Sequence, residues 1–210
     1  MDTKVIVNIG REYGSRGHAI GKKLADDLGI KFYDKLSIEE EAKKAGINQE
    51  LFRAVDKQQT NSFLYSLAMS VYSYGEKISA AGTVSMSDRL YLLQNDIVKN
   101  FAKESCVIVG RSSNYMLRKE KCVNVFIYAD MDKRIKNIME ITGLEESKAK
   151  DEINKIDKKR RSYYNYYTSS KWGTKDFNDM LLDSTYIGID GCVEIIKSLI
   201  KQKYGIEDFN

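Results

Sequence analysis

Short apolar runs recur along this chain, separated by stretches in which apolar residues follow helical spacing. Each run has the length of a strand rather than that of a helix. The pattern therefore predicts five strands. These are residues 5–9, 30–33, 106–109, 123–128 and 180–183.

The stretches between the runs carry the apolar spacing of amphipathic helices. Residues 17–28 have apolar side chains four positions apart, and Gly29 follows as a C-terminal cap. Further helices are predicted at residues 37–45, 48–74, 88–102, 130–142, 145–167 and 192–204, with a short one opening at Ser112. Residues 75–87 and 171–179 lack such a pattern, so we predict loops there.

Strands that alternate with helices are typical of an α/β protein whose parallel sheet carries helices on both faces. A doubly wound sheet of this kind binds its ligands at the carboxyl ends of the strands. The long helical region between the second and third strands is then an insertion over that edge. The basic region near residues 145–175 is a second one.

The first strand runs directly into a glycine-rich turn and a helix, with the sequence Gly10-Arg11-Glu12-Tyr13-Gly14-Ser15-Arg16-Gly17-His18. This order of elements suits phosphate, because glycine lets the main chain approach an anion and amides at the helix start point at it. A Walker A loop ends in G-K-[ST], whereas this chain has Gly17 in the lysine position and Ala19 near the hydroxyl position. The sequence thus predicts a phosphate cradle without its usual cation. The alternative is a plain strand-to-helix turn.

Two polar residues follow the predicted second and third strands. Asp34 ends the second strand, where a carboxylate could orient an acceptor or hold a hydrated magnesium ion. Arg111 follows Gly110 at the end of the third strand, where a guanidinium suits a phosphate clamp. A helix cap for Asp34 and a surface position for Arg111 are the structural alternatives.

A strongly basic stretch at residues 157–167 joins four consecutive cations, residues 158–161, to four tyrosines. Because phosphoryl transfer depends mainly on positioning and on neutralising charge, this stretch favours a lid that brings arginines over phosphates. A solvated helix face and a nucleic-acid patch with interleaved aromatic residues are the alternatives. His18, the only histidine, begins the first helix, where contact with an anion and simple exposure are equally compatible.

Composition narrows the class of protein. Hydrophobic residues make up 42% of the chain and charged residues 30%, as in ordinary globular proteins. No apolar run approaches the ~20 residues that a membrane-spanning helix needs, and charged residues near the start argue against a signal peptide. The three widely spaced cysteines favour reduced thiols in the cytoplasm over a disulfide framework. A net charge of +4 is weak for a nucleic-acid-binding protein, and neither a zinc cluster nor a G-x-S-x-G elbow is present.

Four segments together resemble the cytidylate kinase-like family, a branch of the P-loop nucleoside monophosphate kinases with an altered Walker A loop. These segments are residues 9–25, Phe32-Tyr33-Asp34, residues 106–111 and residues 157–173. They span nearly the whole chain and keep the order of the family's motifs. The resemblance implies a single P-loop kinase-like domain over residues 1–210. It would consist of a core (1–35, 106–142 and 177–210), a helical NMP-binding-type insertion (36–105) and a basic lid (143–176).

The resemblance also implies roles for particular residues. Donor phosphates would lie on the loop at Arg11, Gly14, Ser15, Arg16, Gly17 and His18. The acceptor would contact Asp34, Arg111 and Lys158, and catalysis would depend on Arg16, Asp34, Arg160 and Arg161. Arg11 and Arg16 flank the turn and could supply the missing charge, although a guanidinium fork is not equivalent to a lysine point charge. No magnesium ligands are assigned.

The leading hypothesis is a cytoplasmic phosphotransferase that moves the γ-phosphoryl group of ATP, with Mg²⁺, to a small acceptor such as CMP or dCMP. The alternative is a nucleotide-binding regulatory or interaction protein with a kinase fold and little or no turnover, which the missing lysine and hydroxyl favour. A third is an RNA-associated protein that uses residues 158–167. We expect small-molecule partners rather than a membrane or nucleic acid, and a homodimer through the helical insertion is left open.

Overall fold

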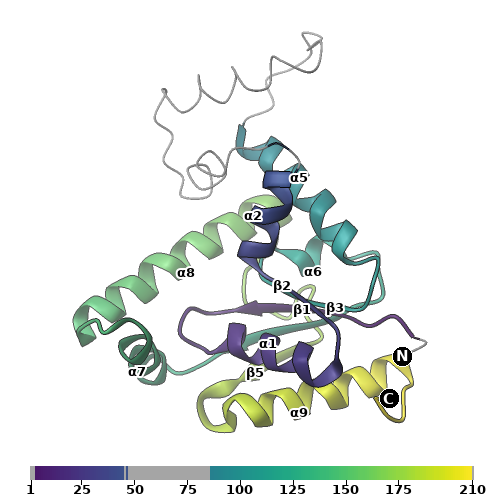
Figure 1. Ribbon diagram of the computed structural model, residues 1–210. Helices are drawn as coiled ribbons and strands as arrows, with labels where there is room; N and C mark the ends of the chain where they lie inside the picture. Colours follow the sequence, from purple (N-terminus) through teal and green to yellow (C-terminus); the bar gives the residue numbers. More distant parts are fainter. Residues whose placement is uncertain (1–2, 45, 47–85, 210) are drawn as a thin grey trace. The chain divides into compact units, whose positions relative to one another are not determined.

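The computed structural model describes residues 3–44, 46 and 86–209. The described residues form a parallel sheet with the strand order β2-β3-β1-β4-β5 (Figure 1). Its strands are β1 Ile6–Arg11, β2 Lys31–Tyr33, β3 Cys106–Val109, β4 Val123–Tyr128 and β5 Met180–Asp183. All five coincide with predicted strands, so the α/β fold with a five-stranded parallel sheet is confirmed.

The helices of the described residues also follow the predicted order. They are α1 Gly17–Leu28, α2 Lys35–Lys44, α5 Met86–Phe101, α6 Ser113–Met116, α7 Met131–Thr142, α8 Glu146–Thr168 and α9 Ser184–Tyr204. Gly29 closes α1 in the left-handed conformation (φ 62°), as the sequence predicts. Asp130 and Ser112 occupy the N-cap positions of α7 and α6.

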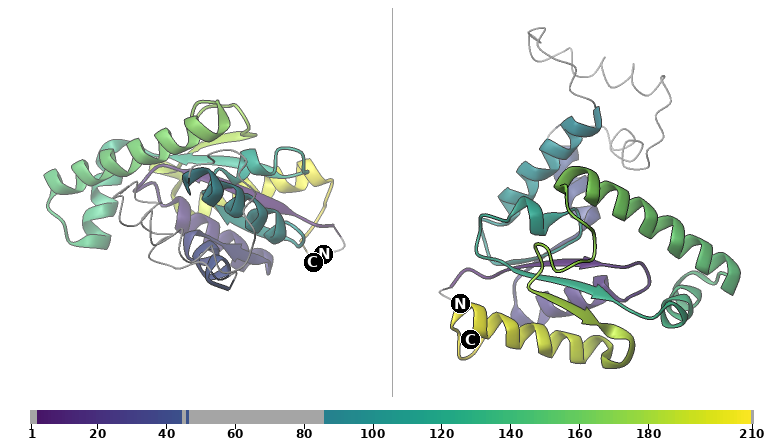
Figure 2. Two further views of the ribbon diagram at one scale, coloured as in Figure 1. Left: turned by 90° about the horizontal axis from the view of Figure 1, so that it is seen from above. Right: turned by 180° about the vertical axis from the view of Figure 1, so that it is seen from behind.

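Both faces of the sheet are buried. Odd-numbered residues of β1, β3 and β4 pack with α1 and α9 in one core, because successive strand residues point to opposite faces. The even-numbered residues Ile6, Asn8, Ile108 and Phe126 are buried on the other face. Figure 2 shows α8 on the side of the sheet opposite α1. The predicted helices on both faces are therefore present.

The chain divides into two compact units. The larger comprises residues 1–35 and 101–210, and it holds the sheet with α1 and α6 to α9. The smaller comprises residues 36–100, and its described part holds nearly all of α2 and α5. In this part Ile38, Ala42 and Val98 are buried. Within the described ranges, no helix is both long enough and apolar enough to cross a membrane.

Two predicted boundaries are wrong. The last helix begins at Ser184 rather than at residue 192, because Asp183 caps it by accepting a hydrogen bond from the Thr185 amide (2.8 Å). A kink at Gly188 interrupts this helix, and the exposed side chain of Tyr186 hides the apolar pattern of its first turn. The predicted loop at 75–87 ends too late, since α5 begins at Met86. The rest of that loop and the predicted helix at 48–74 lie outside the described residues.

The three cysteines, Cys106, Cys122 and Cys192, are free thiols in the interior of the larger unit. Burial raises the pKa of Cys106 to about 12 and the pKa values of Cys122 and Cys192 to about 11. Since the thiolate is the reactive form, we expect no thiol of the native chain to react with Ellman's reagent at pH 8. In denaturant all three should react. Rapid reaction of any thiol in the native chain would contradict this packing.

Candidate functional site

The turn between β1 and α1 exposes a series of backbone amides. Gly14 and Arg16 adopt positive φ angles of 84° and 62°, and α1 begins directly afterwards at Gly17. Within the described part of the chain, the amides of Gly14, Arg16, Gly17 and His18 donate to no protein acceptor. Successive amides that converge in this way, at the positive end of a helix dipole, form a concavity that suits an anion. The backbone of the turn therefore has the properties expected of a phosphate cradle.

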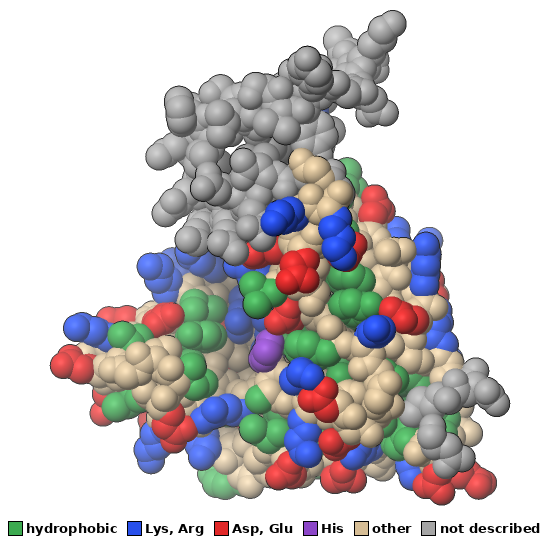
Figure 3. Space-filling model, viewed as in Figure 1, with side chains coloured by type: hydrophobic (Ala, Val, Ile, Leu, Met, Phe, Trp, Pro, Cys, Tyr) green, Lys and Arg blue, Asp and Glu red, His purple; other side chains and the backbone are tan. Residues whose placement is uncertain are grey.

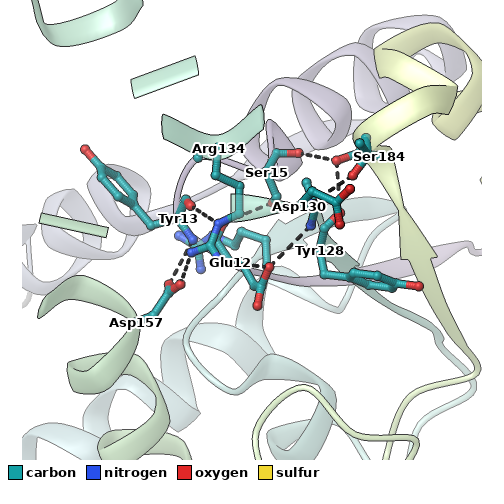
Figure 4. A network of polar contacts seen from close by, with 12 residues as sticks. Glu12, Tyr13, Ser15, Tyr128, Asp130, Arg134, Asp157 and Ser184 are labelled. Atoms are coloured by element: carbon teal, nitrogen blue, oxygen red, sulfur yellow. Dashed lines mark hydrogen bonds and ion pairs between the residues drawn. The ribbon is translucent and has the colours of Figure 1, made fainter. Parts of the chain in front are cut away.

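A buried ion pair holds one side of this turn (Figure 4). Asp157 on α8 accepts a hydrogen bond from the Tyr13 amide (2.8 Å) and pairs with Arg134 on α7. Nε of Arg134 in turn donates to the Tyr13 carbonyl oxygen (2.8 Å), and its Nη1 lies 3.1 Å from Oε2 of Glu12. The side chains of Arg134 and Asp157 are only 6% and 10% exposed, so water screens this pair little. Both α7 and α8 are thereby tied to the turn.

Hydroxyl and amide groups hold the rest of the turn. Oγ of Ser184, the first residue of α9, donates to the carbonyl oxygens of Ser15 (2.8 Å) and Tyr128 (3.0 Å). Nδ2 of Asn137 donates to the Gly14 carbonyl oxygen (2.8 Å). Ser15 is fully buried, and its hydroxyl donates to the Glu12 carbonyl oxygen (2.9 Å). The carbonyl groups are thus occupied within the protein, while the amides named above stay available for a ligand.

The half-buried Arg11 ends β1 beside this turn. Burial lowers the pKa of its guanidinium, and the nearby guanidinium groups of Arg160 and Arg111 lower it further, while the Asp34 carboxylate opposes them. Among the described residues, no hydrogen bond or ion pair engages the Arg11 guanidinium. Several guanidinium groups that lie close to one another are typical of a site for a multiply charged anion.

Arg160 already lies against β1. Its Nη1 donates to the Arg11 carbonyl oxygen (3.2 Å), and its guanidinium lies 5.5 Å from the centre of the Tyr13 ring. Asp157, one helical turn earlier, approaches the same Nη1 at 3.8 Å. Burial lowers the pKa of Arg160, although the Asp157 carboxylate counteracts this. The cation predicted from the basic run is therefore held in place by α8 at the end of the sheet.

Arg111 follows β3 in a strained turn. Gly110, Arg111 and Ser112 have φ angles of 87°, 58° and 54°, three consecutive left-handed residues. Such a conformation costs a non-glycine residue on the order of 1–3 kcal/mol and is concentrated at functional sites. The backbone therefore leaves the regular course of β3 at Gly110 and Arg111.

Asp34 follows β2 and contacts the first helix. Its Oδ2 lies 2.9 Å from Nε2 of His18, and its side chain is 16% exposed, against 58% for His18. Figure 3 shows the single histidine, in purple, with lysine and arginine side chains gathered beside it. The structure thus brings Asp34 and His18 into one pair.

The predicted site residues fall into two groups. Arg11, Asp34, Arg111, Arg160 and the turn from Gly14 to His18 lie at one edge of the sheet. The charged groups of three predicted cations have other partners or are exposed. Arg16 pairs with Glu140 on α7, Arg161 lies over the Trp172 ring (5.8 Å), and Lys158 is exposed.

Some residues that hold the site carried no signal in the sequence. Arg134 stands in a helix rich in charged residues and reads as a solvated position, yet it is only 5% exposed. Ser184 contacts Ser15 across 169 positions of sequence, which no local pattern reports. Only Asp157 could have been found, because it precedes Arg160 by one helical turn in the basic stretch.

The described residues could hold Mg²⁺ together with substrate phosphates, without a full set of protein ligands. In the described residues, no group of three or more histidine, cysteine or acidic side chains is placed to hold a metal ion. Mg²⁺ does not require such a group, because it usually keeps several waters and binds through one or two carboxylates together with substrate phosphates. Asp34, which contacts His18 at the start of α1, is a carboxylate that could contribute in this way.

The parallel sheet, its strand order and the amide-rich turn after β1 define a kinase-like fold of the P-loop class. The chain belongs to the cytidylate kinase-like family, whose model matches residues 6–186. Family and fold together support a phosphotransferase in general. No curated protein sequence matches this chain.

Solved structures share the fold. An uncharacterized protein from Eubacterium ventriosum is 27% identical, with a TM-score of 0.71, and the match covers 94% of this chain and 99% of that one. A shikimate kinase from Acinetobacter baumannii, solved in complex with shikimate, has a TM-score of 0.50 at 12% identity. That match covers 98% of this chain and 96% of the kinase, and at this identity it shows a shared fold alone.

Proposed function

We propose that this chain is a phosphotransferase that moves the γ-phosphoryl group of ATP, with Mg²⁺, to a small phosphorylated acceptor, CMP or dCMP. The observation that supports the proposal is that Arg11 lies against Gly17 of the turn, close enough to Arg111 and Arg160 for their charges to lower its pKa. Among the described residues, the amides of Gly14, Arg16, Gly17 and His18 donate to no protein acceptor. Phosphoryl transfer needs this arrangement, since its transition state spreads negative charge over several oxygens and is stabilised by fixed donors.

The proposal divides the residues by their place in the fold. Turn amides from Gly14 to His18, with Arg11 and Arg16, would hold the donor phosphates. Arg111, Asp34 and Lys158 would hold and orient the acceptor, while Arg160 and Arg161 would neutralise charge during transfer. When bound, Mg²⁺ would offset charge on the donor phosphates. Asp34 would hold it through water.

The proposal extends to the organisation of the chain. Residues 36–105 would form the acceptor-binding insertion, residues 143–176 the lid, and the remainder the core. Free, buried thiols agree with an activity in the cytoplasm. Residues 47–85 lie outside the described residues, so the choice of CMP or dCMP depends on family membership alone.

A nucleotide-binding protein without turnover is the second candidate, because Gly17 and Ala19 replace the lysine and hydroxyl of a Walker A loop. One experiment separates the two. The chain is incubated with labelled ATP, Mg²⁺ and each nucleoside monophosphate in turn, while calorimetry measures the binding of ATP and of CMP. We expect product with CMP or dCMP. Tight binding of both nucleotides without product from any monophosphate would favour the second candidate.

A further inference from the structure

The side chain of Arg11 begins where a side chain of residue 17 would have to start. A Cβ atom built on Gly17 would lie 2.6 Å from Cβ of Arg11 and 3.1 Å from its Cγ. Real Cβ atoms essentially never approach other atoms below 3.0 Å, so one of the two side chains would have to move. A lysine at position 17 and the observed course of Arg11 are therefore mutually exclusive.

The far end of Arg11 reaches the carboxyl end of β3. A Cβ atom built on Gly110 would collide with Nη1 of Arg11 and would lie 2.9 Å from its Cζ. Gly110 also has a φ angle of 87°, which disfavours any other residue there. Two glycines from different elements thus leave a path along which Arg11 runs from β1 to the residue before Arg111.

The Arg11 guanidinium lies near other charged side chains. The guanidinium groups of Arg111 and Arg160 and the Asp34 carboxylate all act electrostatically on Arg11, whose own guanidinium pairs with no acid among the described residues. The other candidate, Arg16, differs in this respect. Its Nη2 is 2.5 Å from Oε2 of Glu140, and it lies at the cap of α1. Of the two arginines that flank the turn, Arg11 is the one whose guanidinium is available.

We infer that Arg11 binds the transferred phosphoryl group in place of the lysine that the turn lacks, and that residue 17 is glycine because the Arg11 side chain crosses it. The inference rests on the proposed function, since it names the principal cation of the same site. It changes how the turn is understood. Compared with a Walker A loop, the positive charge is at the end of β1 instead of on the first helix. There the planar guanidinium of Arg11 can contact two phosphate oxygens at once.

The test uses inorganic tripolyphosphate as the probe and calorimetry of the full chain as the readout. Arg11→Gln keeps the start of the side chain but removes the charge, and it should weaken tripolyphosphate binding by about 10- to 100-fold, the value of a hydrogen bond to a charged group. Arg11→Lys should weaken it less. Gly17→Ala should weaken it by a similar factor to Arg11→Gln, because the new methyl group displaces Arg11. In the Arg11→Gln background, Gly17→Ala should cause no further loss.

Gly21→Ala is the matched control. It adds the same methyl group one turn further along α1, where it would lie 2.7 Å from Cγ2 of Val109 rather than against Arg11. We expect it to lower the free energy of unfolding while leaving tripolyphosphate affinity unchanged.

Two results decide between the inference and the function on which it rests. If Arg11→Gln binds tripolyphosphate as tightly as the wild type, and the wild type transfers phosphate, the inference is overturned and the proposed function stands. If the wild type neither binds tripolyphosphate nor forms product, the proposed function itself fails. If Gly17→Ala does not fold, the tripolyphosphate affinities of Arg11→Gln and Arg11→Lys still show whether the charge of Arg11 contributes to binding.

Discussion

Replacing Arg160 with alanine is expected to lower kcat/KM for phosphoryl transfer by about 100-fold or more, the usual loss when one fixed donor to the transition state is removed. The structure explains why a single arginine should matter so much. Its guanidinium donates a hydrogen bond to the Arg11 carbonyl oxygen (3.2 Å), and this contact with the protein fixes the position of the charge. Steady-state kinetics with ATP and the preferred acceptor measure the effect.

Two further variants give the Arg160 experiment its controls. Lys159→Ala removes the neighbouring charge from an exposed position of α8 and should leave kcat/KM unchanged. Arg160→Lys keeps the charge without the planar fork and should fall between the wild type and Arg160→Ala. Unfolding by urea should show that Arg160→Ala is folded under the assay conditions. A folded Arg160→Ala chain with wild-type kcat/KM would remove Arg160 from the proposed site.

The sheet was predictable because its signal is local. Strands buried on both faces are continuous apolar runs, and three of the five here end at or next to a glycine or an aspartate that stops the run, namely Gly110, Asp34 and Asp183. The start of α9 was missed for the opposite reason. Ser184 begins it while donating to the Ser15 and Tyr128 carbonyl oxygens, and those partners lie far away in the sequence.

Only those residues of the candidate site that directly follow a strand could be predicted from the sequence. Asp34 and Arg111 follow β2 and β3, which are hydrogen-bonded neighbours in the parallel sheet, so their proximity follows from topology. The separation of Arg11 from Arg16 could not be predicted. Both flank the turn in the sequence, and only three-dimensional packing sends one across Gly17 and pairs the other with Glu140.

The turn keeps its shape because three helices that are distant in sequence hold its carbonyl groups and one of its amides. Asp157 and Arg134 act from α8 and α7, and Ser184 acts from α9. Glycine-rich turns are otherwise costly to order, because glycine loses the most conformational freedom on folding. The buried ion pair therefore links the stability of the larger unit to the geometry of its candidate cradle.

Removing the carboxylate of this pair is expected to be the most destabilising of the changes considered. Asp157→Ala should lower the free energy of unfolding by about 3–5 kcal/mol, because Arg134 stays buried with its charge no longer compensated and the Tyr13 amide loses its acceptor. Asp157→Asn should cost less, since an amide oxygen can still accept from Tyr13. Urea denaturation followed by circular dichroism gives both values.

The exposed pair between Lys22 and Asp26 on α1 supplies the comparison. Asp26→Ala breaks a contact between solvated side chains one helical turn apart and should cost only about 0.3–0.5 kcal/mol. If Asp157→Ala destabilised the chain no more than Asp26→Ala, the buried pair would not hold α7 and α8 to the turn. If the expected loss is observed, Asp157→Asn should remain folded and bind tripolyphosphate more weakly than the wild type. The reason is that Asp157 holds the turn in its shape without contacting the ligand.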